Sequence, residues 1–577
     1  MKILLTAINS KYIHSNLAVY NLRAYAREYG RVDHCEISLG EYTINQQSDE
    51  ILMDIYRRKP DVLAFSCYIW NIEYVRRILV EIHKLMPDMP IWLGGPEVSY
   101  CGVQMLEELP QVTGVMIGEG EETFTELAEY YSQEKDVEPI FLTDIKGIIY
   151  RNEQKEIRIN PPRPILDLTK VPFVYYEIEE FKNKIIYYES SRGCPFSCSY
   201  CLSSIDKKLR FRNTAVVLKE LEIFLKHEVK QVKFVDRTFN CNHKHSMAIW
   251  SYIKEHDNGI TNFHFEIAAD LITEDEIALI ATMRRGLIQL EIGVQSTHLD
   301  TIHEIKRVMD FDQVTEVVRK IQEPENIHQH LDLIAGLPHE TYDIFHASFD
   351  EVYALHPEQL QLGFLKVLKG SYMHQQQEEY GLVYQSKPPY EVLYTKWLSY
   401  DDVLRLKGIE DMVEVYYNSG QFVTTMKLLE QSYESAFDLY EQMSDFYDEK
   451  QYRMVKHTRV ARYEILHEFI ISKEHIFKEN MDAYYDALMK DLYLRENAKS
   501  RPKFAKEYSV DKQYVRNFFE KEESEKAVLV GYEKYDRRQM SKMTHIEVLG
   551  GQHVLFDYQN RNPLTNEAAT FILENYI

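Results

Sequence analysis

Three of the seven cysteines in this 577-residue chain lie within the eight residues Cys194-Pro-Phe-Ser-Cys198-Ser-Tyr-Cys201. Seven cysteines placed at random in a chain of this length would give that spacing only about 0.001 times. A structural zinc site normally closes with four ligands, and the closest histidine downstream is His227. Three thiolates instead suit a four-iron four-sulfur cluster that keeps one iron open to another ligand.

An alternation of apolar strands and helical patterns surrounds the cysteine segment and must position it. The strand-like runs from about residue 185 are IIYYES, VKFVD, FHFEIA, LIQLEIGV and HQHLDLIAGL. Helical patterns such as VVLKELEIFLKH and VTEVVRKIQE separate these runs. A series of this kind predicts a partial or complete (β/α) barrel, in which functional groups lie at the carboxyl ends of the strands.

Residues 1 to about 150 show a second alternation, with the strand-like runs KILLTAI, VLAFSCY, IWLGG and GVMIGEG. This rhythm predicts an α/β domain with a doubly wound, Rossmann-like parallel sheet. Ligands of such sheets bind outside the carboxyl ends of the strands. Those ends carry Asn9, Ser66, Gly94, Gly95 and Gly118.

The cysteine segment resembles the signature of radical S-adenosylmethionine (SAM) enzymes, including the aromatic Tyr200 before the last cysteine. The resemblance implies that Cys194, Cys198 and Cys201 bind three irons of a 4Fe-4S cluster while SAM chelates the fourth. One-electron reduction then cleaves SAM to methionine and a deoxyadenosyl radical. In this scheme the cofactor supplies the difficult chemistry, and the barrel directs it and excludes water.

Later strands extend the resemblance to the segments that line SAM in this superfamily. The segments are FVDRTFN, LEIGVQS (290–296) and DLIAGLPHET (332–341). The resemblance implies polar contacts with SAM and a shaped adenine side. The residues concerned are Asp236, Glu266, Gln295 and Ser296 for the polar contacts, and Gly336 and Pro338 for the adenine side.

The first domain resembles the cobalamin-binding domain that is fused to a large subgroup of radical SAM enzymes. The resemblance rests on three strand ends: Ser66 with Tyr68, Gly94-Gly95-Pro96-Glu97, and Gly118-Glu119-Gly120. It implies that all of these residues bind the cofactor, that Ser66 and the pair Gly94-Gly95 line the nucleotide tail of cobalamin, and that the acidic glycine loop precedes the last helix. Glycine is needed where the backbone approaches a bulky ligand closely.

His14 lies close to the axial histidine of an Asp-x-His-x-x-Gly motif in free-standing cobalamin domains. Tyr12 and Leu17 replace the Asp and Gly of that motif. Axial ligation of cobalt, a hydrogen bond to a corrin side chain and a plain surface position therefore stay open for His14.

The sequence divides into four parts. Residues 1–160 are the expected cobalamin domain, and 161–184 are a linker that contains the proline-rich NPPRPILDLTKVPF. Residues 185–384 are the expected barrel. Residues 385–577 read as mainly helical and tyrosine-rich, with closing strands in HIEVLGGQHVLFDYQ, and we expect them to cover the barrel mouth or to carry substrate specificity.

The formal charge of -24 argues against general binding to nucleic acid or to an anionic membrane. A local basic patch of Lys207, Lys208, Arg210 and Arg212 is either a solvated loop or a phosphate or substrate contact. The chain has no apolar run of about 18 residues, and its cysteines are too few and too unevenly placed for a disulfide scaffold. These features predict a cytoplasmic protein.

The leading interpretation is a cobalamin-dependent radical SAM methyltransferase that acts on an unactivated carbon, with SAM as both radical source and methyl source. It requires a one-electron donor such as flavodoxin or ferredoxin, and a substrate that is either a small molecule or a modified biopolymer. Alternatives are ring formation or rearrangement with cobalamin, and methylthio transfer with a second cluster on Cys35, Cys67 and Cys101. An alternative of another class is a non-catalytic cobalamin or redox sensor.

Overall fold

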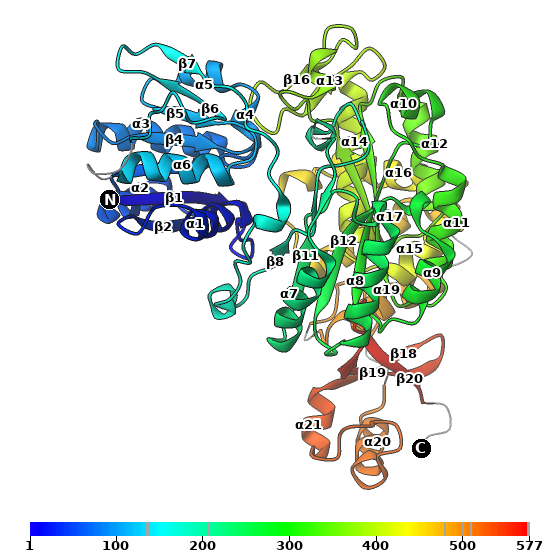
Figure 1. The fold of residues 1–577 in the computed structure, drawn as a ribbon. Helices are drawn as coiled ribbons and strands as arrows, with labels where there is room; N and C mark the ends of the chain where they lie inside the picture. The colour runs from blue at the N-terminus through cyan, green and yellow to red at the C-terminus, as the bar shows by residue number, and fades with distance from the viewer. Residues whose placement is uncertain (134–138, 206, 478–480, 499, 508–509, 574–577) are drawn as a thin grey trace.

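The computed structural model describes all residues except 134–138, 206, 478–480, 499, 508–509 and 574–577. Its N-terminal domain contains a seven-stranded sheet (Figure 1). The strand order is β2-β1-β3-β4-β5-β6-β7. The first five strands pair in parallel, and β6 and β7 add an antiparallel edge. The chain reverses its direction across the sheet between β1 and β3, which is where ligands of such folds bind. This arrangement confirms the predicted doubly wound sheet.

Apolar runs of the sequence form the inner strands of this domain. All residues of β1 except the first are buried, because helices cover both faces of the sheet. Helices α1 and α6 pack together on one face, and α2 packs with α3 on the other. The elements are β1 Lys2–Asn9, α1 Leu17–Tyr29, β2 Glu36–Thr43, α2 Ser48–Arg58, β3 Val62–Ser66, α3 Ile72–Leu85, β4 Ile91–Gly94, α4 Pro96–Ser99, α5 Gly102–Glu108, β5 Gly114–Met116, α6 Glu121–Ser132, β6 Ile148–Arg151 and β7 Ile157–Ile159.

The segment 161–184, expected as a linker, packs against both neighbouring domains. The Tyr175 hydroxyl donates a hydrogen bond of 2.5 Å to the Tyr187 carbonyl in β8 (Ile186–Tyr188). Toward the first domain, Lys184 Nζ lies 2.7 Å from a carboxylate oxygen of Glu41. The segment is therefore a structured strap that fixes the two domains to each other.

The central domain is a six-stranded, all-parallel sheet in the order β8-β11-β12-β13-β14-β15. No pairing between β8 and β15 closes the sheet within the described residues, so the predicted barrel is a partial one. Its elements after β8 are β9 Ser191–Arg192, β10 Arg210–Phe211, α7 Thr214–Lys226, β11 Gln231–Phe234, α8 His243–Glu255, β12 Asn262–Ile267, α9 Glu274–Ala281, β13 Ile288–Gln295, α10 Leu299–Glu304, α11 Phe311–Gln322, β14 His328–Ala335, α12 Tyr342–Tyr353 and β15 Gln359–Phe364.

The two faces of the barrel sheet differ sharply in polarity. Residues such as Phe263, Phe265 and Leu290 are fully buried in the core. In each strand, the residues that alternate with these core residues point to the opposite face of the sheet, the inside of the partial barrel. We call this face the lumen face. Strand register places on it Tyr187, Lys233, His264, Glu266, Glu291, His330 and Asp332.

The C-terminal helices extend the outer helical layer past β15. Helix α14 (Tyr400–Val413) packs on β15, and α16 (Ala436–Glu449) packs on α12. A π-helical turn, Glu414–Asn418, follows α14. It places Asn418 so that its Oδ1 accepts from the Leu360 N–H at 2.9 Å and its Nδ2 donates to the Leu360 carbonyl at 2.8 Å. Asn418 thereby provides hydrogen-bond partners for the Leu360 backbone at the open edge of β15, the edge at which a seventh strand could pair.

The remaining C-terminal elements confirm a mainly helical region that closes with strands. An antiparallel sheet in the order β18-β19-β20 lies with α20 and α21 at one end of the molecule (Figure 1). None of the described helices has both the length and the apolar composition needed to cross a bilayer. The elements are α15 Val423–Glu430, α17 Arg459–Ser472, α18 Glu474–Phe477, α19 Met481–Arg495, α20 Lys512–Glu525, α21 Arg537–Lys542, β18 Thr544–Leu549, β19 Gln552–Arg561 and β20 Ala568–Ile572.

The segment that lies against the cysteine loop differs from the expected lid. It contains α13 (Tyr372–Gln375) and the hairpin of β16 (Val383–Tyr384) and β17 (Val392–Tyr394). Its Met373 N–H donates to the Ser199 carbonyl at 2.8 Å. This segment starts before residue 385, whereas α14 and the π-helical turn after it pack beside β15. The role expected for residues 385–577 as a whole stays a prediction.

We predict that Asn418→Ala lowers the free energy of unfolding by about 1–3 kcal/mol, because it leaves the Leu360 N–H and carbonyl without their partners. Glu414→Gln is the matched control, since Glu414 contacts the Asn418 side chain rather than β15. Urea unfolding followed by circular dichroism measures both variants. Equal midpoints for the two variants would contradict this role of Asn418.

Candidate functional site

The cysteine loop follows β8 at the carboxyl end of the partial barrel. Gly193 begins it with a φ of 95°, a left-handed conformation that favours glycine. Cys194 and Cys198 are buried and Cys201 is partly exposed. Within the described residues, the three thiols form no set whose sulfur atoms all lie within 4.8 Å of one another. Three sulfurs bound to one tetrahedral zinc ion through bonds of about 2.3 Å would lie closer together than this limit, so the arrangement does not favour zinc. Three thiolates remain the ligand set expected of an iron-sulfur cluster with one open iron.

Asp236 anchors the start of the cysteine loop. Its Oδ1 accepts from the hydroxyls of Ser190 and Ser191 at 2.6 Å each, and its Oδ2 accepts from the Ser190 N–H at 2.9 Å. Burial raises the pKa of Asp236 to about 6, although these hydrogen bonds oppose the rise. Because both oxygens are engaged, we revise the predicted role of Asp236 from a SAM contact to an anchor of the loop.

Arg307 borders the other side of the cysteine loop and was missed in the sequence. One guanidinium nitrogen lies 3.8 Å from Cys198 Sγ and 3.4 Å from the Tyr200 hydroxyl, and the other donates to the Gly293 carbonyl. Arg307 Nε is buried without a hydrogen-bond partner. A cation beside a cysteine favours the thiolate form that binds iron. The sequence around Arg307, which follows α10, contains no motif that marks this residue. Only the fold reveals that Arg307 lies beside the cysteine loop.

The predicted SAM-side residues meet at the ends of β13 and β14. Gln295 has a φ of 75°, is buried, and its Oε1 has no hydrogen-bond partner in the described residues. The Ser296 hydroxyl donates to Glu340 Oε1 at 2.5 Å. Gln295 therefore keeps an amide oxygen available for a ligand, whereas Ser296 is already engaged.

Gly336 and Pro338 lie in the loop after β14. Gly336 has a φ of 89°, and a Cβ there would approach Val392 of β17 to 2.8 Å. Pro338 is buried. Glycine is therefore required at 336 by the hairpin that packs on it, whatever else the loop contacts.

Among the predicted cobalamin-side glycines, Gly118 has the clearest room for a ligand. It is exposed, has a φ of 76°, and a Cβ built there would meet nothing within 4 Å. At Gly95 a Cβ would come within 2.5 Å of the Cys67 carbonyl oxygen, and at Gly94 and Gly120 it would meet Met116 and Leu22 side chains. Close packing against the backbone and a φ of 106° explain the glycine at 95, whereas the side chains of Met116 and Leu22 could move aside at 94 and 120. The space at Gly118 would admit a bulky ligand.

The loop after β1 turns toward the barrel. The buried Asn9 side chain donates to the His14 carbonyl and to Glu41, each at 3.1 Å. His14 Nδ1 lies 2.5 Å from the Tyr187 hydroxyl on the lumen face. Burial, Lys11 and Lys233 lower the pKa of His14, so that its imidazole is neutral near pH 7. One imidazole nitrogen is thus occupied by Tyr187, and only Nε2 is left for other ligands.

The ends of β3 and β4 also reach other parts of the chain. Ser66 accepts from the Asn16 side chain at 3.3 Å, and the Tyr68 ring stacks on Trp70 with centroids 4.3 Å apart. Glu97 is buried and accepts a hydrogen bond from the Tyr390 hydroxyl of the segment between β16 and β17. The predicted contact of the Glu97 carboxylate with cobalamin is therefore replaced by a contact within the chain.

A partly buried ion-pair junction, which we call the Arg192 junction, joins the two candidate loops. Arg192 in β9, directly before the cysteine loop, lies 2.7 Å from Glu119, 2.7 Å from Glu121 and 2.8 Å from Glu189. Arg210 adds a second contact to Glu119 at 2.9 Å. Burial favours a higher pKa for Glu119, but Arg192, the Leu166 N–H and Arg210 together hold it below the ordinary value. The Glu119 carboxylate therefore serves this junction rather than a ligand.

The N-terminal cysteines do not form a second cluster site. Strand pairing places Cys35 beside the start of β1 and Cys67 beside its end. About seven residues at 3.3 Å each separate those levels by roughly 20 Å. Cys101 donates to the Glu97 carbonyl at 3.4 Å. The geometry thus contradicts the alternative that needs Cys35, Cys67 and Cys101 on one cluster.

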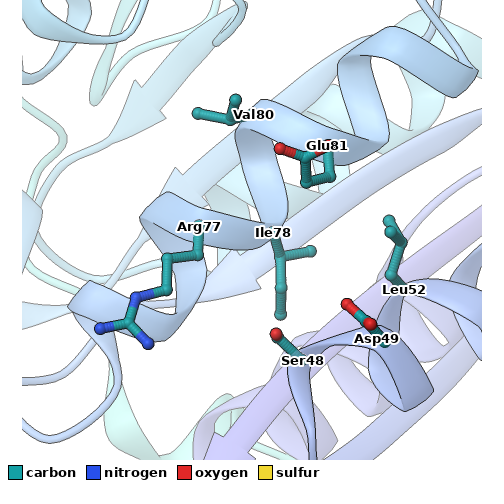
Figure 2. Close-up of a pocket in the computed structure, with 7 residues that line it drawn as sticks. All are labelled: Ser48, Asp49, Leu52, Arg77, Ile78, Val80 and Glu81. Carbon is teal, nitrogen blue, oxygen red and sulfur yellow. The ribbon is translucent and has the colours of Figure 1, made fainter.

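A surface pocket of about 260 Å³ lies away from these loops, between α2 and α3. Figure 2 shows that both helices contribute its polar and apolar side chains. The lining residues are Ser48, Asp49, Leu52, Arg77, Ile78, Val80 and Glu81. None of the predicted site residues is among them, so this pocket carries no part of the site.

The lumen face below the cysteine loop holds a charged network. Glu291 Oε2 lies 2.9 Å from His264 Nε2 and 3.0 Å from Lys233 Nζ. Burial opposes ionisation of Glu291, yet His264 and Lys233 lower its pKa to about 2. Burial raises the pKa of Glu266 to about 7, and Arg237 lies 3.7 Å away. The predicted SAM contact Glu266 therefore belongs to this network, which the sequence did not otherwise reveal.

Comparison with known families divides the chain in the same way. A B12 binding domain matches residues 3–128, and the Radical SAM superfamily matches residues 188–352. A family described as a protein of unknown function (DUF4080) matches residues 378–573. The chain therefore combines a segment that matches the B12 binding domain with a segment that matches the Radical SAM superfamily.

Two relatives are named as methyltransferases. The uncharacterized methyltransferase PH0819 of Pyrococcus horikoshii is 27% identical over 305 residues, which are 51% of this chain and 64% of that protein. The cobalamin-dependent radical SAM methyltransferase TokK of Streptomyces tokunonensis is 26% identical over 390 residues, 63% of this chain and 55% of that protein. The chain thus spans less than two thirds of either relative.

A solved structure shows the same fold. The cobalamin-dependent radical SAM enzyme OxsB, with aqua-cobalamin and SAM bound, superposes with a TM-score of 0.60 at 14% identity. The superposition covers 85% of this chain and 83% of OxsB. The two-domain arrangement with a C-terminal extension is therefore shared at the level of the fold.

We predict that Arg192→Met destabilises the folded protein by about 3–5 kcal/mol, because three partly buried carboxylates lose their common partner. Arg158→Met is the matched control, since the Arg158–Glu156 pair is more than half exposed and contributes at most about 1 kcal/mol. Thermal unfolding compares both with the wild type. An unchanged midpoint for Arg192→Met would contradict a structural role of the junction.

Glu340 predicts a pH dependence of stability. Burial raises its pKa to about 8, far above that of an unfolded glutamate, so the native state holds a proton that the unfolded state releases. This group therefore lowers stability by about 1.4 kcal/mol per pH unit as the pH rises from about 5 toward 8. Glu340→Gln should flatten the pH dependence of the melting temperature, and Glu351→Gln, on the exposed side of α12, should not. Identical pH profiles for wild type and Glu340→Gln would refute the assignment.

Proposed function

We propose that this radical SAM protein with a B12-binding domain is a cobalamin-dependent methyltransferase that transfers a methyl group to an unactivated carbon. The observation that carries the proposal is the Arg192 junction. It holds the loop after β5, next to the open space at Gly118, against the loop that contains the three cysteines. The loop expected to bind cobalamin and the loop expected to bind the iron-sulfur cluster therefore face one reaction space.

The residues present fit a cluster and SAM at the barrel end. Cys194, Cys198 and Cys201 would hold three irons, with Arg307 beside Cys198. The free Oε1 of Gln295 suits a donor of SAM. When bound, the cluster and SAM supply one-electron cleavage of the sulfonium, and the corrinoid supplies methyl transfer. The chain itself fixes the loop through Asp236 and covers it with the segment that contains α13.

The first domain would hold cobalamin at the carboxyl ends of its parallel strands. Gly118 provides the space for close approach, and Asn9 fixes the backbone of the loop that carries His14. The contact with Tyr187 directs His14 toward the barrel, and its free Nε2 is the one nitrogen that remains for a corrin group or for cobalt.

The substrate would lie over the lumen face, where polar side chains recognise polar groups. Lys233 and Glu291 form a fixed ion pair there, and Glu266, with a pKa near 7, can hold or release a proton at its carboxylate. A small molecule or a modified biopolymer as substrate, flavodoxin or ferredoxin as electron donor, and a cytoplasmic location complete the proposal. Seven free cysteines support a reducing compartment.

Cobalamin-dependent ring formation or rearrangement needs the same cofactor loops, so the fold alone does not separate it from methyl transfer. Relatives named as methyltransferases are 26–27% identical to this chain, and relatives named as anaerobic magnesium-protoporphyrin IX monomethyl ester cyclases are 20–25% identical, which favours methyl transfer. A non-catalytic sensor would need only the cluster or the corrinoid, and it would have no use for a buried polar lumen.

Metal analysis of anaerobically purified protein from cobalamin-fed cells tests the cofactor assignment. We predict about four irons and one cobalt per chain, the content of one cluster plus a corrinoid. A variant with alanine at Cys194, Cys198 and Cys201 should lose the iron and keep the cobalt, while the nearby Cys241→Ala should keep both. Iron near eight atoms per chain without cobalt would refute the assignment.

Incubation of the reduced holoprotein with SAM that carries a deuterated methyl group, and with metabolite extract, tests the reaction. A methyltransferase of this type should form 5′-deoxyadenosine and S-adenosylhomocysteine together, and the deuterated methyl should appear in one product by mass spectrometry. Formation of 5′-deoxyadenosine and a product without the label would favour ring formation or rearrangement and would contradict the proposed methyl transfer.

A further inference from the structure

Three potential metal ligands meet on the lumen face, apart from the cysteine loop. Glu291 on β13 pairs in register with His330 on β14, and Asp332 follows two residues later on the same face. One ligand atom from each of these residues lies within 4.8 Å of the other two. No other set of three or more such ligand atoms within that distance occurs in the described residues.

Two of the three side chains carry a buried polar atom that lacks a hydrogen bond of acceptable geometry. The His330 side chain is buried, being 7% exposed, and the atom is its Nε2. The Asp332 side chain is partly exposed, and the atom is its Oδ1. These two atoms face each other at 3.0 Å as an ion pair, and this separation is also close to that of neighbouring ligands around one ion. A shared cation would satisfy both atoms at once.

The third side chain is held in place from behind. Glu291 Oε2 contacts both Lys233 Nζ and His264 Nε2. The other carboxylate oxygen, Oε1, receives no hydrogen bond from the described residues. Metal-binding carboxylates are commonly oriented by a hydrogen-bonding partner of this kind. The positive charge of Lys233 also offsets part of the negative charge of the two carboxylates. The site therefore favours a divalent ion that binds imidazole over a hard, highly charged ion.

We propose that Glu291, His330 and Asp332 bind a divalent first-row transition-metal ion in the barrel lumen. One imidazole and two carboxylates form an N/O donor set that suits Zn(II), Fe(II) or Mn(II), and carboxylates from two strands with one histidine leave open positions for water or a substrate oxygen. None of its three residues is among the cysteines or among the residues assigned to the corrinoid. A role of the ion in holding a polar substrate group rests on the proposed function, but metal binding itself does not.

Zinc is the probe, because neither the cluster nor cobalamin contains it. The holoprotein, with its cluster and corrinoid loaded so that the cysteines are occupied, is treated with a mild chelator and dialysed against Zn(II). Zinc, iron and cobalt are then measured per chain. The wild type should bind one zinc, and zinc should raise its melting temperature, since a ligand that binds only the native state stabilises it.

The variants Glu291→Gln, His330→Gln and Asp332→Asn should each weaken zinc binding at least tenfold while the iron and cobalt contents stay unchanged. His328→Gln is the matched control, because His328 lies on the same strand and face two residues before His330 but outside the triad. It should bind zinc as the wild type does.

Two results would overturn the proposal. One is a wild-type holoprotein that binds no zinc and shows no zinc-dependent change in melting temperature, a measurement that needs no variant. The other is zinc binding that persists at full affinity in Glu291→Gln and Asp332→Asn. A wild-type protein that never contains iron or cobalt would instead contradict the proposed function, and zinc binding is then compared in Asp332→Asn and in the variant with alanine at Cys194, Cys198 and Cys201, so that zinc held by the cysteines is told apart from zinc held by the triad.

Discussion

The Arg192 junction is the interaction on which the arrangement of the two candidate cofactor loops depends. One guanidinium contacts Glu119 and Glu121 from the first domain and Glu189 from the second, and Arg210 reinforces it. A paired charge in this partly buried setting is costly to separate, because removing one member leaves the others without compensation. The strap 161–184, through Lys184 and Glu41, and the segment with α13, through Tyr390 and Glu97, join the same two domains.

The sequence predicted those features that are local or periodic. The spacing of Cys194, Cys198 and Cys201 is a local pattern, and strand and helix alternation fixed both α/β domains and the closing strands of the C-terminal region. The number of barrel strands was not predictable, because the alternation does not show where strand pairing ends, and the contact of Asn418 with the edge of β15 comes from a π-helical turn far along the chain. The position of the covering segment was likewise not predictable, because the contact of Met373 with Ser199 joins residues that are far apart in the sequence.

Individual site roles were harder to predict than the site itself. Asp236, Glu97 and Glu119 stand at the expected places, yet their carboxylates are used within the chain, by Ser190, Tyr390 and Arg192. A motif shows which residue stands at a strand end but not which partner reaches it from elsewhere in the fold. For the same reason the lumen network of Lys233, Glu291 and His330 escaped notice, because it combines alternate residues of separate strands through register alone.

The central claim is that the Arg192 junction holds a corrinoid and an iron-sulfur cluster across one reaction space. Pulsed electron paramagnetic resonance of the reduced holoprotein, in which cob(II)alamin and the reduced cluster are both paramagnetic, measures their dipolar coupling. A fixed junction predicts one well-defined coupling and a narrow distribution of cobalt–cluster distances. An absent coupling, or a broad distribution like that of two domains moving independently, would contradict this account.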